Sequence, residues 1–525
     1  MNIVLFSYNS SFTHTNLAVR CIRSALKSSF HTVSVIEKSE KDSYDEVLYS
    51  LYAKRADIYG FSCYIWNISA TERLARDLKA LLPGARIIFG GPEVSFYGDE
   101  FFYSHPYVDS LIKGEGEEAF PYAIDHPEEK IIEGKAYAHF EESGIHYCED
   151  EDLASEIVYY ESSRGCPFKC SYCLSGANSK LRMKSVEKTL SDLYEFEKFD
   201  GIKIIKLVDR TFNADKKRAL DIWEALLSDK FTKSYHFEIC ASLIDSEAID
   251  LLSKFPKGKI QLEIGVQSTN PAVLSSINRH DDPEKIISVT QKLHSLGNIH
   301  IHADLIAGLP LEDLDSIKNS FNSLFGKCDQ LQLGFLKLLH GSPLESKTAP
   351  HSYVFSSHPP YQILSNRYLS QDDIYYLKGV ESVLDRYSKE SFRRSIDILS
   401  KKVLPFELFA GLSKKADNIK KLSQVSAYKL LYSYARENGF LCDNLEDSIR
   451  LDFLLSESHS LPDEFSLVKV DDKELRARFL AHNRDFSVKS LEVYETFSDK
   501  EKLLFVDRRA GIYKIVKKDE IRNNS

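Results

Sequence analysis

The sequence predicts an α/β protein with an N-terminal doubly wound parallel-sheet domain, a partial (β/α)6 barrel and a mostly helical C-terminal domain. Two stretches of the chain alternate short apolar runs with amphipathic helical segments, and the last stretch does not. Strands that are apolar throughout and separated by helices are typical of parallel sheets covered on both faces. With 525 residues, the chain is also too long for one hydrophobic core.

The first domain is expected over residues 1–135. Its strand candidates are NIVLFSY, HTVSVIE, DIYGFSCYIW, ARIIFGG and VDSLIKG. Between them lie segments such as LAVRCIRSALKSS and ATERLARDLKALL, in which apolar residues recur at helical spacing. This alternation predicts a Rossmann-type domain whose ligand crevice lies at the carboxyl ends of the strands.

A polar, acidic segment at residues 136–157 is expected to be a linker, and a second alternation follows at 158–345. Its strand candidates are IVYYESS, GIKIIKLVD, YHFEICAS, KIQLEIGVQ, IHIHADLIAG and DQLQLGFLKL. Six strands favour a partial barrel over a closed one of eight strands. In the last domain, residues 346–525, helical patterns cover 375–402 and 425–437, and LLFVDRRAGIYKIV indicates a hairpin around 508–511.

Composition limits the partners of the chain. The net charge is −10 and the pI is about 5.9, which weighs against a nucleic-acid backbone as the main partner. No apolar run reaches the roughly 20 residues of a membrane-spanning helix. The N-terminus has neither the basic region nor the cleavage site of a signal peptide, so a cytoplasmic location is expected.

Three of the nine cysteines, Cys166, Cys170 and Cys173, form a C-x3-C-x2-C motif directly after the first barrel strand. Three thiolates on one short loop can bind three irons of a 4Fe–4S cluster and leave the fourth iron open to a small chelating molecule. The alternative is a zinc site, but structural zinc usually has four protein ligands in two pairs. Cys148 and Cys240 could contribute to such a site, although both are isolated in the sequence.

This cysteine loop resembles the signature of the radical S-adenosylmethionine (radical SAM) superfamily, with Gly165 and Pro167 around the first cysteine and Tyr172 before the last. The resemblance implies that S-adenosylmethionine binds the open iron through its amino and carboxylate groups. An electron from a donor such as flavodoxin or ferredoxin then cleaves it to a 5′-deoxyadenosyl radical. The main-chain groups of Tyr172 would contact the adenine.

Similarity to the class that contains oxygen-independent coproporphyrinogen oxidases and cobalamin-dependent members extends over Val158–Pro343. By that resemblance Glu238, Gln267, Arg279 and Asp304 bind the ribose hydroxyls and the methionyl carboxylate, with Arg279 on the helix that follows KIQLEIGVQ. Strand ends at the top of a β/α barrel are where sites form, and buried polar groups there need partners. No glycine–glycine–glutamate motif follows the second strand, so the group that binds the methionyl amino nitrogen is not identified.

The segment KLVDRTFNADKKRALDIW places Asp209 and Arg210 near the same barrel mouth. It resembles the Asp-x-x-Phe element of cobalamin-dependent members, which implies that Asp209 and Arg210 position substrate or support the cofactor. The alternative is an ordinary strand–helix turn in which Asn213 is the N-cap.

The N-terminal domain resembles the cobalamin-binding domain found ahead of many radical SAM enzymes, through SYNSSFTHTNLAVR, GFSCYIWN, GGPEVS and KGEGEEAF. The Asp-x-His-x-x-Gly pattern of histidine-ligated cobalamin is absent, so we expect cobalamin to bind without histidine ligation. An alternative is a flavodoxin-like domain that lacks the cofactor. The resemblance implies a cobalamin site formed by His14, Ser62, Gly90, Gly91, Gly114 and Glu115.

These resemblances imply a cobalamin-dependent radical SAM methyltransferase that acts on an unactivated carbon of a small molecule or peptide. One S-adenosylmethionine would methylate cobalamin and a second would generate the radical. A rearrangement, cyclisation or oxidation with the same cofactors is an alternative, and a non-catalytic iron–sulfur or cobalamin sensor is another. The C-terminal domain resembles a domain of unknown function found behind such enzymes, and the sequence does not identify the substrate.

Overall fold

The computed structural model describes residues 1–11, 14–27, 29–39, 41–147, 155–176, 180–416, 418–456, 468–496 and 499–523. The chain forms two compact units. The first comprises Met1–Ser316, Lys327–Asp329 and Phe335–Ser370, and the second comprises Ile317–Gly326, Gln330–Gly334 and Gln371–Ser525.

A six-stranded parallel sheet forms the N-terminal domain, in the order β2-β1-β3-β4-β5-β6. The five expected strands are present, β3 ends before CYIW, and β6 is an addition that the sequence did not predict. The strands are β1 (Asn2–Asn9), β2 (Thr32–Ser39), β3 (Ile58–Ser62), β4 (Arg86–Gly90), β5 (Ser110–Gly114) and β6 (Ile131–Gly134).

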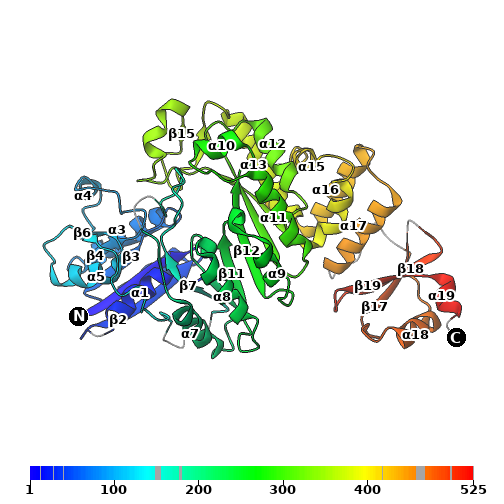
Figure 1. Ribbon diagram of the computed structural model, residues 1–525, viewed down its shortest axis with the longest axis horizontal. Coiled ribbons are helices and arrows are strands. Elements are labelled where there is room, and N and C mark those ends of the chain that lie inside the picture. Colours follow the sequence, from blue (N-terminus) through cyan, green and yellow to red (C-terminus); the bar gives the residue numbers. More distant parts are fainter. Residues whose placement is uncertain are drawn as a thin grey trace. The chain divides into compact units, whose positions relative to one another are not determined.

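Helices cover both faces of this sheet (Figure 1), which confirms the doubly wound arrangement. Successive residues of a strand face opposite sides: Phe6 packs into the core under α2 and α3, whereas Leu5 packs into the core under α1 and α5. The helices are α1 (Leu17–Ala25), α2 (Tyr44–Tyr52), α3 (Ile68–Leu81), α4 (Phe101–Ser104) and α5 (Gly116–Asp125).

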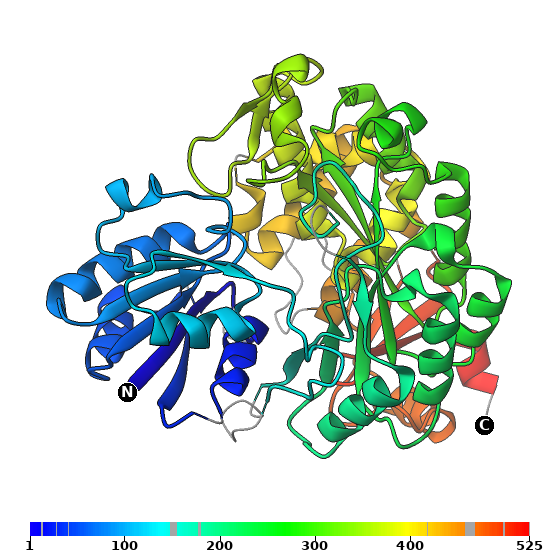
Figure 2. The same ribbon diagram turned by 60° about the vertical axis from the view of Figure 1, so that its left-hand side comes forward.

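The second sheet has the strand order β14-β13-β12-β11-β10-β7, and this confirms the partial (β/α)6 barrel. In Figure 2 the green helices cover one face of the green strands. Strand β12 alternates buried apolar residues with half-buried polar ones, so its polar side chains face away from those helices. The strands are β7 (Ile157–Tyr160), β10 (Ile204–Leu207), β11 (Ser234–Ile239), β12 (Ile260–Gln267), β13 (His300–Ala307) and β14 (Gln330–Phe335). The helices are α7 (Val186–Glu197), α8 (Lys216–Leu226), α9 (Ser246–Leu252), α10 (Pro271–Ser276), α11 (Pro283–Ser295) and α12 (Leu314–Leu324).

A short antiparallel pair that the sequence did not predict flanks the cysteine loop. Strand β8 (Ser163–Arg164) precedes the first cysteine and β9 (Arg182–Met183) follows the last. Their register places Arg164 directly opposite Arg182. The two strands therefore bring together the beginning and the end of the segment that carries the cysteines.

The C-terminal part is mostly helical, with a three-stranded antiparallel sheet near the end. The expected hairpin is confirmed, because β18 and β19 pair from Lys502↔Lys517 to Asp507↔Ile512. The expected helix over 375–402 is interrupted by a 3-10 turn at Glu390–Phe392. Among the described residues, no helix is long and apolar enough to span a membrane. The elements are α13 (Gln371–Tyr387), α14 (Arg393–Leu399), α15 (Pro405–Ser413), α16 (Gln424–Glu437), α17 (Asp443–Ser456), α18 (Lys473–His482), α19 (Lys518–Asn523), β15 (Val354–Phe355), β16 (Ile363–Ser365), β17 (Leu491–Glu495), β18 (Lys502–Asp507) and β19 (Ile512–Lys517).

Candidate active site

The three cysteines of the motif lie between β8 and β9, and all three are partly exposed. Thr211 Oγ1 lies 3.4 Å from Cys166 Sγ, and the backbone N–H of Ser175 donates to Cys173 Sγ at 3.4 Å. Hydrogen bonds to cysteine sulfurs stabilise the thiolate form and tune the potential of an iron–sulfur cluster. The loop therefore offers the donor set that a cubane cluster needs.

The geometry bears on the zinc alternative. Within the ranges that the structure describes, no three His, Cys, Asp or Glu side chains converge on a single-ion site. A zinc ion requires such convergence, whereas in a cubane each thiolate binds a different iron and the sulfurs stay apart. Cys240 is buried, and its sulfur lies 3.0 Å from Ser242 Oγ. Cys148 lies outside the described residues.

Gln267 ends strand β12 with its side-chain acceptor unused. Its φ is +70°, at an irregularity in the register between β12 and β13. A Cβ atom on Gly265 would lie 2.3 Å from Gln267 Nε2, so only glycine lets this amide fold back along the strand. Gln267 Oε1 is buried and has no hydrogen-bond partner among the described residues. A buried acceptor of this kind fits a ligand that brings a donor.

Arg279 lies in the turn after α10 and not on the helix, which corrects the sequence prediction. Asn278, with a φ of +63°, ends the helical path just before it. Nη1 of Arg279 donates to the Gly265 carbonyl at 2.7 Å, while Nε and Nη2 donate to Asp281 at 2.9 and 2.6 Å. These bonds hold a guanidinium beside Cys170 and Tyr172.

Glu238 and Asp304 lie on the polar face of the barrel sheet. The register pairs Glu238 with Glu263, and Gly265 with Asp304. Burial, together with the negative charges of Glu263 and Glu238, raises the pKa of Asp304 to about 8. Burial also raises the pKa of Glu238. Carboxyl groups in this state can donate as well as accept hydrogen bonds, which suits recognition of hydroxyl groups.

Asp209 ties together the ends of two strands. Its carboxylate accepts the backbone N–H groups of Ser162 and Ser163 at 2.8 and 2.6 Å and is hydrogen-bonded by the Ser162 hydroxyl. The side chain is fully buried, and burial raises its pKa to about 6. Its contacts position the chain that leads from β7 into the cysteine loop.

The two other polar residues of this segment differ from one another. Arg210 is exposed at the mouth, with Nη1 3.8 Å from Glu238 Oε1. Asn213 is not the helix N-cap, because its side chain pairs with both backbone groups of Cys240 at 2.9 Å. Asp215 caps α8 instead, by accepting the N–H of Arg218.

In the N-terminal domain, His14 lies in the loop after β1, and Ser62 is the last residue of β3. His14 Nδ1 is hydrogen-bonded to the hydroxyl of Tyr159 on β7, so this loop contacts the first barrel strand. The Asn16 amide donates to Ser62 Oγ at 3.1 Å, and its oxygen accepts the Val19 N–H as N-cap of α1. The loop after β1 and the end of β3 are thus joined at the edge where the sequence places the ligand crevice.

The glycines of the predicted cobalamin site have local structural causes. Gly91 has a φ of +119°, and a Cβ there would lie 2.5 Å from the Cys63 carbonyl. Gly114 has a φ of +77°, and its Cβ would lie 2.5 Å from the Gly134 carbonyl. A Cβ on Gly90 would make ordinary contact with Ile112 at 3.6 Å. Only the first two positions therefore require glycine for the backbone.

Two glutamates at this edge have different surroundings. Glu93 follows β4, and its Oε1 is buried without a hydrogen-bond partner in the described part of the chain. Glu115 follows β5, and its carboxylate binds Arg164 and Arg182. Of the two, Glu93 has the unused acceptor.

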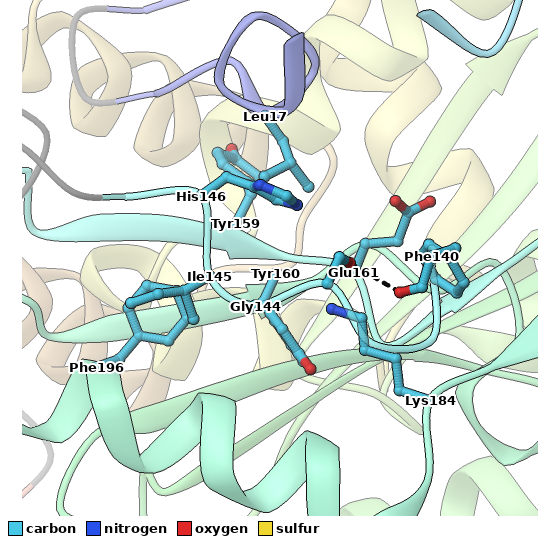
Figure 3. Close-up of a pocket in the computed structure, with 11 residues that line it drawn as sticks. Leu17, Phe140, Gly144, Ile145, His146, Tyr159, Tyr160, Glu161, Lys184 and Phe196 are labelled. Atoms are coloured by element: carbon cyan, nitrogen blue, oxygen red, sulfur yellow. Dashed lines mark hydrogen bonds between the residues drawn. The ribbon is translucent and has the colours of Figure 1, made fainter. Parts of the chain in front are cut away.

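A small pocket (Figure 3) has no cysteine in its lining, and its Lys184 and Glu161 side chains are already paired. Lys184 lies 3.4 Å from Asp192, Glu161 binds Arg164, and burial lowers the pKa of His146 to about 4. The lining residues are Leu17, Phe140, Ser143, Gly144, Ile145, His146, Tyr159, Tyr160, Glu161, Lys184 and Phe196. This pocket does not contain the chemistry that the cysteine motif indicates.

Sequence analysis missed three polar residues of the barrel interior: His236, Glu263 and His302. His236 Nε2 lies 3.0 Å from Glu263 Oε2, and His302 Nε2 lies 3.3 Å from Asp304 Oδ1. The signal that could have found them is the period-two polar alternation of YHFEICAS, KIQLEIGVQ and IHIHADLIAG, in which they share a face with the predicted residues.

Comparisons with known proteins agree with this architecture. Three family models match the chain: a B12 binding domain at residues 6–124, the radical SAM superfamily at 160–324, and a protein of unknown function, DUF4080, at 349–507. Among solved structures, the cobalamin-dependent S-adenosylmethionine radical enzyme OxsB with aqua-cobalamin bound aligns with a TM-score of 0.60 at 15% identity. That alignment covers 86% of this chain and 84% of OxsB, and it shows similarity of fold.

Two curated relatives are methyltransferases. The chain is 27% identical over 340 residues to 2-(S-pantetheinyl)-carbapenam-3-carboxylate methyltransferase of Streptantibioticus cattleyicolor, covering 55% of this chain and 48% of that protein. It is 24% identical over 342 residues to the cobalamin-dependent radical SAM methyltransferase TokK of Streptomyces tokunonensis, covering 58% and 50%. The chain spans about half the length of these relatives.

The matched domains account for the cofactors. The radical SAM domain, with its cysteine loop, implies a 4Fe–4S cluster and S-adenosylmethionine, and the B12 binding domain implies cobalamin. The three domains occur in the order that the sequence resemblance predicts. The chain therefore contains an N-terminal B12-binding domain, a domain of the radical SAM superfamily and a C-terminal DUF4080 domain, in that order.

Proposed function

We propose that this enzyme transfers a methyl group to an unactivated carbon of a small-molecule or peptide substrate. The observation that carries the proposal is the contact between His14, from the B12-binding domain, and Tyr159, on the first strand of the barrel. This contact brings the crevice edge of one domain to the barrel that holds the cysteine loop. The curated relatives, both named methyltransferases, support the same reaction class.

The residues present fit the implied groups. In the barrel, the unpaired acceptor Gln267 Oε1 and the guanidinium of Arg279 suit the donor and carboxylate groups of a methionyl moiety. In the N-terminal domain, the unpaired Glu93 Oε1 suits the amide donors at the edge of a corrin ring. When bound, the cluster and S-adenosylmethionine supply a 5′-deoxyadenosyl radical, and cobalamin supplies a methyl group.

Each protein group then has a defined task. Cys166, Cys170 and Cys173 bind three irons, and the main chain of Tyr172 contacts the adenine. Arg279 opposes the methionyl carboxylate. Glu238 and Asp304 bind the ribose hydroxyls.

Two further groups of residues complete the assignment. The cobalamin crevice is lined by His14, Ser62, Gly90, Gly91 and Gly114, with His14 as a contact and not as a cobalt ligand. Arg210, exposed at the barrel mouth, orients the substrate. A flavodoxin or ferredoxin supplies the electron.

The test uses the full chain, reconstituted anaerobically with iron, sulfide and cobalamin, and incubated with S-adenosylmethionine and a low-potential reductant. If the enzyme transfers a methyl group, the assay should yield two products: 5′-deoxyadenosine, and at least one molecule of S-adenosylhomocysteine per bound cobalamin. Formation of 5′-deoxyadenosine without S-adenosylhomocysteine would overturn methyl transfer in favour of a rearrangement, cyclisation or oxidation. Formation of neither product by fully loaded protein would favour a sensor.

A further inference from the structure

Arg164, two residues before the ligand Cys166, is surrounded by three carboxylates. Its Nη1 lies 2.6 Å from Glu115 Oε2, and its Nη2 lies 2.7 Å from Glu117 Oε1. Glu161 accepts hydrogen bonds from Nε of Arg164 at 3.1 Å and from Nη2 at 2.7 Å. Every nitrogen of this guanidinium is therefore bound. Two of the three carboxylates, Glu115 and Glu117, belong to the B12-binding domain and not to the barrel that carries Arg164.

Glu115 also binds Arg182, which lies opposite Arg164 in the β8–β9 pair. Arg164 and Arg182 are directly opposite in the β8–β9 register, and like charges in that position repel. One oxygen of Glu115 binds Arg164 and the other binds Arg182. Backbone groups of Tyr137 complete the arrangement, since its N–H donates to Glu115 at 2.8 Å and its carbonyl accepts from Arg182 at 3.0 Å.

The surroundings make this bridge stronger than a surface ion pair. Arg164, Arg182 and Glu115 each have about 20% of the side chain exposed. The ring of Phe140 is buried, with Arg164 at 4.8 Å and Arg182 at 5.3 Å from its centre. Cation–π attraction holds both guanidinium groups at this ring while Glu115 neutralises their repulsion.

We infer that Glu115 is a positioning residue for the iron–sulfur site. Glu115 bridges Arg164 and Arg182 at the base of the cysteine loop and holds the two ends of the loop together. It does so from the B12-binding domain and is not itself a cluster ligand. Both of its oxygens are engaged in this bridge, so the carboxylate serves the loop and not cobalamin. The inference is independent of the reaction type, because it concerns retention of the cluster.

The first experiment compares Glu115→Gln with Glu118→Gln in the full chain, reconstituted anaerobically with iron, sulfide and cobalamin. Glu118 is an exposed neighbour on α5 with one long contact, the Ala138 N–H at 3.4 Å. We expect Glu115→Gln to release iron to a chelator about ten-fold faster than wild type, from the loss of charge-assisted bonds. Cobalamin retained after desalting should be unchanged, and Glu118→Gln should match wild type in both measurements.

Iron release at the wild-type rate from Glu115→Gln would overturn the inference, whether or not cobalamin is lost. A second variant separates bridging from general destabilisation. Adding Arg182→Gln to Glu115→Gln removes the repulsion, so iron release should return to within about two-fold of wild type. If the double variant releases iron as fast as Glu115→Gln or faster, Glu115 supports the fold in general and the bridging role is wrong.

Discussion

The hydroxyl of Tyr159 is hydrogen-bonded to Nδ1 of His14, and this contact joins the B12-binding domain to the barrel. The two rings lie 6.0 Å apart. Burial, with the positive charge of Lys206 nearby, lowers the pKa of His14. The imidazole is therefore neutral at physiological pH, and its orientation is set by a residue of the other domain.

Tyr159→Phe removes this hydrogen bond while keeping the ring. Because one hydrogen bond contributes about 1 kcal/mol, we expect cobalamin to bind about five-fold more weakly. The measurement is cobalamin retained at equilibrium across a dialysis membrane. Tyr122→Phe is the matched control, since that hydroxyl donates to Glu129 on the exposed surface. Equal affinity of Tyr159→Phe and wild type would show that the contact does not order the cobalamin loop.

Cys170→Ala removes one of the three proposed iron ligands. We expect the iron–sulfur absorption to fall to a small fraction of that of wild type and the formation of 5′-deoxyadenosine to stop. Cys442→Ala is the control, because this cysteine lies in the C-terminal part of the chain, far from the motif in sequence. A full cluster in Cys170→Ala would contradict the ligand assignment.

Asp304→Asn tests the raised pKa of this carboxyl. The pKa is 3.8 for the free side chain and about 8 in the folded protein, so the folded state holds its proton more tightly. The stability that this provides is complete below pH 4 and is lost as the pH rises to 8. Asparagine does not titrate, so the stability of Asp304→Asn relative to wild type should rise by up to about 6 kcal/mol over that range. Thermal unfolding of protein without S-adenosylmethionine measures this, and parallel pH profiles of the two proteins would refute it.

Asp209→Asn separates a structural role from a catalytic one. Asparagine turns an NH2 group toward donors that the carboxylate accepted, so the free energy of unfolding should fall by about 2 kcal/mol. Asp200→Asn, at an exposed site, should leave unfolding unchanged. Denaturant titration followed by circular dichroism provides the measurement. Wild-type stability combined with loss of 5′-deoxyadenosine formation would instead place Asp209 in the chemistry.

Sequence reasoning was strongest where the pattern is local. The parallel sheets follow from short strand-like runs separated by helical segments, and the cysteine motif is contained in eight consecutive residues, Cys166 to Cys173. Strand β8 and its partner have two residues each, too few for any periodicity to show. Short strands of this kind depend on tertiary contacts, which the sequence does not display.

The individual differences between prediction and structure have two causes. Asn213 has the residue type of an N-cap, but its amide pairs with the Cys240 backbone, 27 residues away. Arg279 follows the helical pattern, but the positive φ of Asn278 ends α10 before it. The bridge from Glu115 to Arg164 joins residues 49 apart, and ion pairs over such separations leave no periodic trace. The missing information was therefore side-chain partners that are distant in sequence and, for Arg279, the backbone turn at Asn278.

The carboxylate of Glu115 precedes both arginines along the chain, and this bears on how the enzyme is made. Synthesis proceeds from the N-terminus, and domains generally fold in that order. The B12-binding domain can therefore be folded, with Glu115 in place, before Arg164 and Arg182 leave the ribosome. The cysteine loop can then dock on a finished domain, so the order of the segments along the chain also sets the order in which the two sides of the bridge form.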